Sequence, residues 1–75
     1  MQTTEEVLVI IGHNIRKLRK SKKWSQADLS LKVGMHRSYI GAIENGKKNI
    51  SLIKLALLAK VFEIGLEKLV VTTKN

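Results

Sequence analysis

The chain has 75 residues, no cysteine and no proline, and its 14 basic and 6 acidic side chains give a formal net charge of +8. This length predicts one domain, and the lack of cysteine excludes disulfides and thiolate metal sites. Eleven of the basic residues lie between Arg16 and Lys54, where Asp28 and Glu44 are the only acids. Such a region attracts phosphate backbones, although charge alone does not separate DNA from RNA or an anionic membrane.

Five helices are expected, at residues 5–22, 26–33, 37–45, 52–62 and 66–70, which makes the chain all-α. Thr3 with Glu6 and Ser25 with Asp28 have the spacing of capping boxes, which start the first two helices. The first helix also carries an apolar stripe at three- and four-residue intervals. Gly34 is placed to end the second helix in a left-handed conformation.

The third helix is expected to follow His36, and a basic loop then leads to Ser51, the cap of the fourth helix. We expect the tail from Thr72 to be frayed. The side chains expected on the buried face of the fourth helix are Leu52, Leu55, Leu58, Ala59 and Phe62.

The second and third helices match a helix-turn-helix unit. With Gln26 as position 1, Ser30 at position 5 is small enough for the next helix to cross, and Gly34 at position 9 permits a sharp turn. Apolar residues at positions 4, 8, 15 and 18 anchor the unit; they are Leu29, Val33, Ile40 and Ile43. This arrangement predicts that the third helix enters a DNA major groove.

The stretch WSQADLSLKVGMHRSYIGAIENGKKNISLIKLALLAKVFEI resembles the lambda-repressor-like, or XRE-type, helix-turn-helix family, whose compact fold has five helices. Within that family, HRSYIGAIENGKKN is similar to the controller proteins of restriction–modification systems, which are small dimeric autoregulators. Two residues depart from the pattern. Ser30 stands where alanine is commoner, and Lys48 precedes Asn49 where controllers more often have arginine, which unlike lysine binds phosphate bidentately.

The start of the third helix is the expected site of base readout. Arg37 is the strongest candidate, because a guanidinium pairs bidentately with guanine O6 and N7. The alternatives are a solvated or phosphate-bound Arg37, a packed Tyr39, and a His36 that caps or flanks the helix. The candidate base-reading residues are His36, Arg37, Ser38 and Tyr39.

Phosphate contacts are expected from both sides of that helix. Free N–H groups and the positive dipole end at the start of the second helix favour phosphate, and the resemblance implies a backbone clamp by Gln26. An ordinary basic loop is the alternative for the residues after the third helix. The candidates are Ser25, Gln26, Lys47, Lys48 and Asn49.

The resemblance also implies a structural ion pair and a dimer interface. Glu44 is expected to pair with Arg19 of the first helix, because an unpaired acid on a basic face would repel phosphate. The interface is expected at apolar residues near the fourth and fifth helices. The alternative is that these residues complete the core of the single chain. They are Ile50, Leu52, Leu66, Leu69 and Val70.

The sequence therefore predicts a homodimeric, sequence-specific DNA-binding transcription regulator that acts on a near-palindromic operator as the autoregulatory controller of a restriction–modification operon. A phage-type repressor and the antitoxin of a toxin–antitoxin pair are the alternatives. RNA polymerase is a further candidate partner. RNA binding is less favoured, because stacking aromatics are missing.

Catalysis, metals, cofactors, small-molecule ligands and membrane association are not expected. His13 and His36 lack triad or metal-ligand companions, and no Gly-rich phosphate loop is present. The longest apolar run, Val7 to Ile11, is too short to cross a bilayer, and no signal-peptide pattern is seen. A cytoplasmic location is the expectation.

Overall fold

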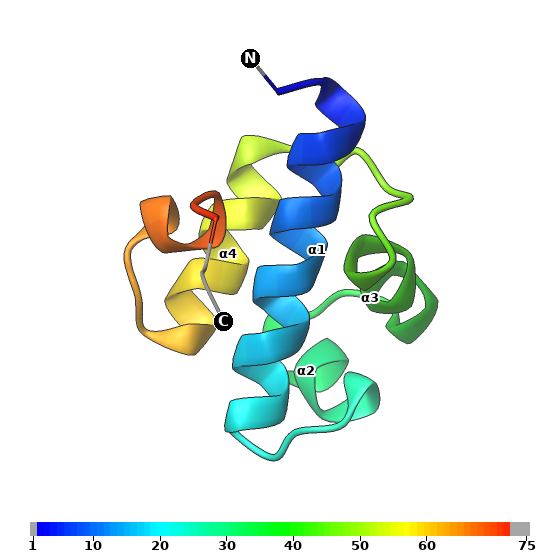
Figure 1. Cartoon of the computed structure of the whole chain (residues 1–75). Helices are drawn as coiled ribbons and strands as arrows, with labels where there is room; N and C mark the ends of the chain where they lie inside the picture. Colours follow the sequence, from blue (N-terminus) through cyan, green and yellow to red (C-terminus); the bar gives the residue numbers. More distant parts are fainter. Residues whose placement is uncertain (1, 73–75) are drawn as a thin grey trace.

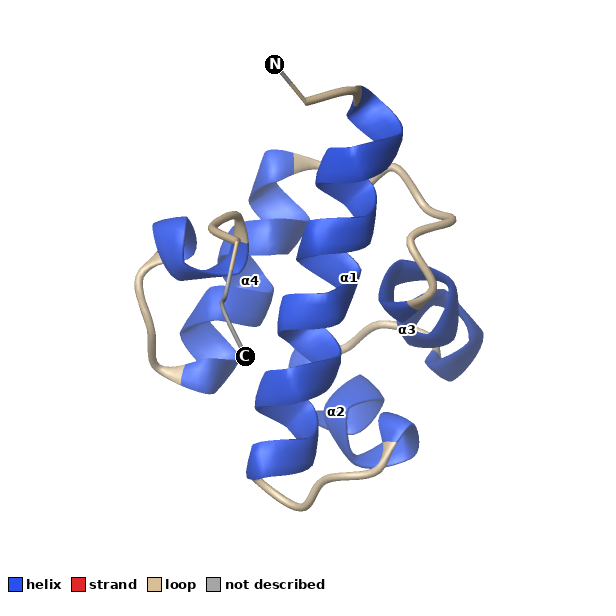
Figure 2. Ribbon diagram, viewed as in Figure 1, coloured by secondary structure: helices blue, strands red, loops and turns tan. Residues whose placement is uncertain are grey.

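The computed structural model describes residues 2–72, in which four α-helices are followed by one turn of 3₁₀ helix (Figure 1). Helix α1 spans Thr4–Ser21, α2 Gln26–Val33, α3 Arg37–Glu44 and α4 Leu52–Phe62, and the 3₁₀ turn η1 spans Leu66–Leu69. Figure 2 shows helices joined by loops, and no strand occurs in residues 2–72. The tail expected to be frayed lies, beyond Thr72, outside the described residues.

The helix starts are set by local side-chain chemistry. In α1, Glu6 N–H donates to the Thr3 hydroxyl over 3.1 Å, and Thr3 N–H donates to the Glu6 carboxylate over 2.7 Å. Ser51 caps α4 by accepting from Lys54 N–H over 3.2 Å. Each bond satisfies a backbone group that has no partner within its own helix. Cap chemistry therefore fixes where these helices begin.

The core forms where α1 crosses the other elements (Figure 1). Gly12 lies at the crossing of α1 and α3, where an added Cβ would collide with the carbonyl oxygen of Ile43. This close approach depends on glycine. The buried apolar side chains are Ile11, Ile15, Leu29, Ile40, Ile43, Leu55, Leu58, Ala59, Phe62 and Leu69.

Two expectations about the C-terminal half are wrong. The fifth α-helix is instead the 3₁₀ turn η1, in which backbone N–H groups donate three residues back: Lys68 to the carbonyl of Gly65 over 3.0 Å, and Val70 to that of Glu67 over 3.3 Å. Gly65 offers no side-chain cap that would start a longer helix. Leu52 does not lie on the buried face of α4, since its side chain is 69% exposed. It is the first residue of α4, one turn before Leu55, the first buried residue of that helix.

None of the helices within residues 2–72 combines the length and apolar character needed to span a membrane.

In Figure 1, α3 lies on one side of α1, and α4 with η1 lies on the other. The expected DNA-reading helix and η1 thus lie on different sides of α1.

Candidate nucleic-acid interface

The turn between α2 and α3 is fixed by glycine and by buried side chains. Gly34 has a φ of +75°, and its N–H donates to the Ser30 carbonyl over 2.9 Å. Leu29 of α2 and Ile40 of α3 are both fully buried. This packing holds the two helices together and leaves the outer face of α3 free, as a helix-turn-helix requires.

The N-terminus of α3 is an exposed polar surface. His36 is the cap residue, and its ring Nδ1 accepts from Ser38 N–H over 3.1 Å. The side chains of His36, Arg37 and Ser38 are exposed, and Tyr39 is half-buried. The structure therefore brings the four candidate base-reading residues to one helix end.

Tyr39 lies among lysines from two other segments. The Nζ of Lys48, from the loop after α3, is 5.6 Å from the ring centroid of Tyr39, and the Nζ of Lys54, from α4, is 4.6 Å away. Ammonium groups at these distances are attracted to the electron-rich face of the ring. Lys54 was not among the candidate phosphate-binding residues expected from the sequence. Its position in the first turn of the helix capped by Ser51, close to the basic loop, could have indicated it.

A buried ion pair ties α3 to α1. Arg19 Nε donates to Glu44 Oε2 over 2.6 Å, and Arg19 Nη2 donates to Glu44 Oε1 over 2.9 Å. Arg19 Nη1 also donates to the carbonyl of Trp24 over 2.8 Å. Both charged residues are buried, and the hydrogen bonds to Glu44 raise the pKa of Arg19 above its ordinary value. The acid on the basic face is thus neutralised internally by the partner expected from the sequence.

Gln26 shares the same carboxylate. Its Nε2 donates to Glu44 Oε1 over 3.1 Å, so one of its two amide hydrogens is engaged inside the protein. The second amide hydrogen and the backbone N–H at the start of α2 are the groups that fit the expected phosphate contact. Any clamp by Gln26 is therefore braced against α3 through Glu44.

Ser25 begins α2 in a capping box. Its hydroxyl accepts from Asp28 N–H over 2.9 Å, and its own N–H donates to Asp28 Oδ2 over 2.8 Å. The hydrogen bonds from the backbone and then the side chain of Ser25, with the charge of Lys32, hold the pKa of Asp28 below its ordinary value. The first role of Ser25 is therefore structural.

The loop between α3 and α4 is basic and exposed. Gly46 turns the chain after α3 with a φ of +69°, and the N–H of Lys47 donates to the carbonyl of Ala42 over 2.9 Å. The side chains of Lys47, Lys48 and Asn49 are exposed. They are available to phosphates that flank a groove occupied by α3.

The expected dimer-interface residues divide into three groups. Leu52 and Val70 are exposed, whereas Ile50 and Leu66 are half-buried against the core. Leu69 is 0% exposed, so its assignment to an interface is wrong: η1 turns this side chain into the core. Ile53 and Leu57 of α4, which the sequence did not single out, are 75% and 45% exposed, because the apolar pattern of α4 continues around the helix.

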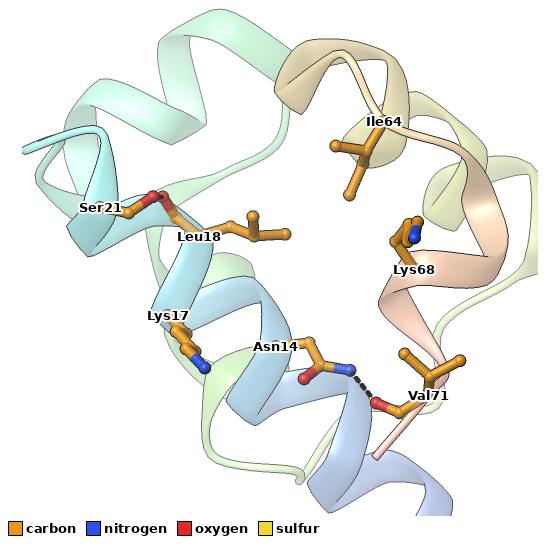
Figure 3. A pocket seen from close by; sticks show the side chains of 7 residues that line it. All are labelled: Asn14, Lys17, Leu18, Ser21, Ile64, Lys68 and Val71. Carbon is orange, nitrogen blue, oxygen red and sulfur yellow. Dashed lines mark hydrogen bonds between the residues drawn. The ribbon is translucent and has the colours of Figure 1, made fainter. Parts of the chain in front are cut away.

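A groove of about 450 Å³ lies between α1 and the segment after α4 (Figure 3). Asn14 forms part of its wall and donates from Nδ2 to the carbonyls of Leu69 and Val71 over 2.9 and 2.8 Å. Asn14 Oδ1 is buried without a partner among residues 2–72. Asn14 thus fastens the C-terminal segment to α1, a role signalled in the sequence only by a polar residue beside the apolar stripe.

Metal-ligating side chains do not gather at this interface. Among residues 2–72, no group of three His, Cys, Asp or Glu residues is close enough to hold a metal ion. The donors and charges on the exposed face suit phosphates and base edges instead.

Comparison with known proteins gives consistent matches. The helix-turn-helix family model matches residues 15–69. Control protein C.SmaI of Serratia marcescens is 34% identical over 64 residues, which cover 85% of this chain and 76% of that protein. The crystal structure of the restriction-modification controller protein C.AhdI from Aeromonas hydrophila has a TM-score of 0.79 at 39% identity, covering 83% of this chain and 94% of that one.

A further match is the restriction-modification controller protein C.Esp1396I, a tetramer in complex with its natural 35 base-pair operator. It has a TM-score of 0.74 at 30% identity and covers 85% of this chain and 93% of that one. The matched family region includes α2, α3, the basic loop and α4.

Proposed function

This chain belongs to the helix-turn-helix family, and we propose that it is a sequence-specific DNA-binding regulator of transcription that controls a restriction–modification operon as a homodimer. The observation that carries the proposal is the exposed N-terminus of α3, held on a buried Arg19–Glu44 pair in a chain similar to several control proteins. The similarity to these control proteins favours this function over a phage-type repressor or an antitoxin.

Recognition follows from the position of α3. Inserted into a major groove, its N-terminal residues reach base edges, and the guanidinium of Arg37 fits guanine O6 and N7. Gln26, Ser25 and the loop residues Lys47, Lys48 and Asn49 bind the flanking phosphates and fix the register of the protein on DNA. Lys54 joins this phosphate-binding set, because its ammonium lies beside the same ring as that of Lys48.

A second copy of the chain covers the exposed apolar face of α4, which we call the α4 patch and define as Leu52, Ile53 and Leu57. Adjacent large apolar side chains at this exposure favour burial, and a chain of this length gains stability from a partner. A two-fold dimer places two α3 helices in successive major grooves about 34 Å apart, so the operator is near-palindromic. This patch keeps Leu52 from the interface set expected from the sequence and adds Ile53 and Leu57, while Ile50, Leu66 and Val70 stay predictions.

The regulator requires no cofactor in this scheme, and its input is its own concentration. Dimerisation and the filling of adjacent sites make the response to concentration steep. Contact with RNA polymerase is not part of the mechanism proposed here. The cytoplasmic location expected from the sequence stays a prediction.

The proposal is tested by fluorescence anisotropy with the duplex upstream of the chain's own gene and a scrambled duplex of equal length, each over a series of salt concentrations. We expect tighter binding to the upstream duplex, two protomers per site and a steep salt dependence. Equal affinity for the two duplexes at every salt concentration would contradict regulation at the chain's own promoter. Binding to neither duplex would contradict the DNA-binding role itself.

A further inference from the structure

The hydrogen bonds at the start of α3 have a fixed direction. Ser38 N–H lies 3.1 Å from His36 Nδ1, and the Ser38 hydroxyl oxygen lies 2.8 Å from the same nitrogen. A backbone N–H can only donate, so Nδ1 is the acceptor and a neutral ring carries its proton on Nε2. With no proton on Nδ1, the short contact to Ser38 is a hydrogen bond only if the hydroxyl donates.

This arrangement removes a freedom that serine normally has. A serine hydroxyl rotates, so it can donate to a base acceptor or accept from a base amino group. With Nδ1 as the acceptor, the hydroxyl proton of Ser38 is directed to His36, which leaves the lone pairs of Oγ as the groups available to a base. Both side chains are exposed at the helix end that faces the groove in the proposed complex.

Helix capping alone does not account for the choice of histidine. Serine, threonine, aspartate and asparagine are the preferred cap residues, and any of them would satisfy the N–H of Ser38. The ring adds the 2.8 Å contact to the Ser38 hydroxyl, which the cap does not need. Capping therefore does not explain the contact between His36 Nδ1 and the Ser38 hydroxyl.

We propose that His36 is a positioning residue that holds the Ser38 hydroxyl as a fixed acceptor, so that Ser38 selects an adenine or cytosine amino group on the strand it contacts. Guanine O6 or thymine O4 at the same place would set two acceptors against each other and leave both unpaired. This rejection of the wrong base is what gives specificity. The inference rests on the proposed function, because it requires α3 to lie in a major groove.

The first test locates and then deletes the amino group. The wild-type chain selects its site from a random duplex library, and Ser38→Ala identifies the base position whose preference is lost. We expect adenine or cytosine there. Replacing that base with purine or 2-pyrimidinone, which lack the amino group, should weaken wild-type binding about five- to tenfold, as expected for one hydrogen bond. The Ser38→Ala variant should show no further loss, because the two changes remove the same bond.

The second test separates positioning from capping. His36→Ser keeps a preferred cap and frees the hydroxyl proton of Ser38, so guanine or thymine should be accepted at that one position within about twofold. The base preference assigned to Arg37 should persist. His36→Gly, which also caps with little loss, is the second variant, and circular dichroism checks that each variant is helical.

The outcomes are distinct. Full retention of the adenine or cytosine preference in both His36 variants would reduce His36 to a cap and overturn the inference. A guanine or thymine preference in the wild-type chain at the Ser38 position would overturn it as well. If Ser38→Ala keeps the base preference at every position, the inference is also overturned. Failure of the wild-type chain to select any sequence would overturn the proposed function and the inference with it.

Discussion

The half of the molecule that contains α1, α2 and α3 is organised differently from the half that contains α4 and η1. In the first half, capping boxes, a left-handed glycine and a bidentate ion pair fix each helix and hold α3 outward. In the second half, hydrogen bonds from the side chain of Asn14 and the burial of Leu69 fasten the chain after α4, and α4 leaves an apolar face uncovered. In the proposed complex, the first half presents the DNA-reading surface and the second half receives the partner.

The largest effect is expected from breaking the ion pair beneath α3. Glu44→Leu leaves the buried guanidinium of Arg19 without its partner and should lower the free energy of unfolding by about 3–5 kcal/mol. Urea denaturation measures this. The matched control, Arg19→Met combined with Glu44→Leu, removes both charges and should recover most of the loss. An equally unstable double variant would show that the pair's charge is not what matters.

Asn14→Ala tests the fastening of the C-terminal half. It removes two hydrogen bonds to backbone carbonyls and should cost about 2 kcal/mol. Hydrogen exchange should show η1 opening first, with α2 and α3 still protected. Asn49→Ala, at an exposed loop residue, is the control and should leave exchange unchanged. Uniform loss of protection across all helices would mean that the two halves are not separable in this way.

The α4 patch is tested by Ile53→Glu. The side chain is 75% exposed in the single chain, so helicity and folding should be preserved, whereas dimer affinity should fall at least about tenfold through burial of a charge. Analytical ultracentrifugation measures the dissociation constant. Leu31→Glu is the control, because Leu31 is 82% exposed on α2, outside the patch, and should not affect assembly. Equal dissociation of both variants would remove α4 as the interface.

The smallest effect concerns the start of α2. The pKa of Asp28 is lowered in the folded chain, so its ionised carboxylate stabilises the fold above the ordinary pKa near 4. This contribution is lost as the pH falls below about 4 and through the lower folded pKa. The urea midpoint of the wild-type chain should therefore drop more between pH 6 and about 3 than that of Asp28→Asn. Parallel curves would show that the capping box has no charge-dependent part.

The same contrast explains what the sequence could predict. Thr3, Ser25, Ser51 and Gly34 act on their own neighbours in the chain, so their spacing indicates where helices begin and end. The Arg19–Glu44 pair was predicted from the family resemblance, not from spacing. Residues whose contacts lie far away in the sequence leave no such spacing pattern, so their roles are harder to predict.

Four residues show why the rest could not be predicted. Gly12 matters only because α3 crosses there, and Asn14 because η1 ends beside it. Leu69 and Leu52 are both apolar, and only the packing of η1 and α4 determines that the first is buried and the second exposed. The contacts that the candidate base and phosphate residues make with DNA stay predictions.

The central claim is that the N-terminus of α3 reads sequence while its neighbours bind phosphate. The most direct measurement compares Arg37→Lys with Lys48→Ala on the selected duplex and a scrambled duplex by anisotropy over a range of salt concentrations. Arg37→Lys keeps the charge and loses bidentate pairing, so it should cost about 1–3 kcal/mol on the selected duplex only. Lys48→Ala should weaken both duplexes alike and reduce the salt slope by about 1. Equal losses on both duplexes for Arg37→Lys would contradict readout by α3.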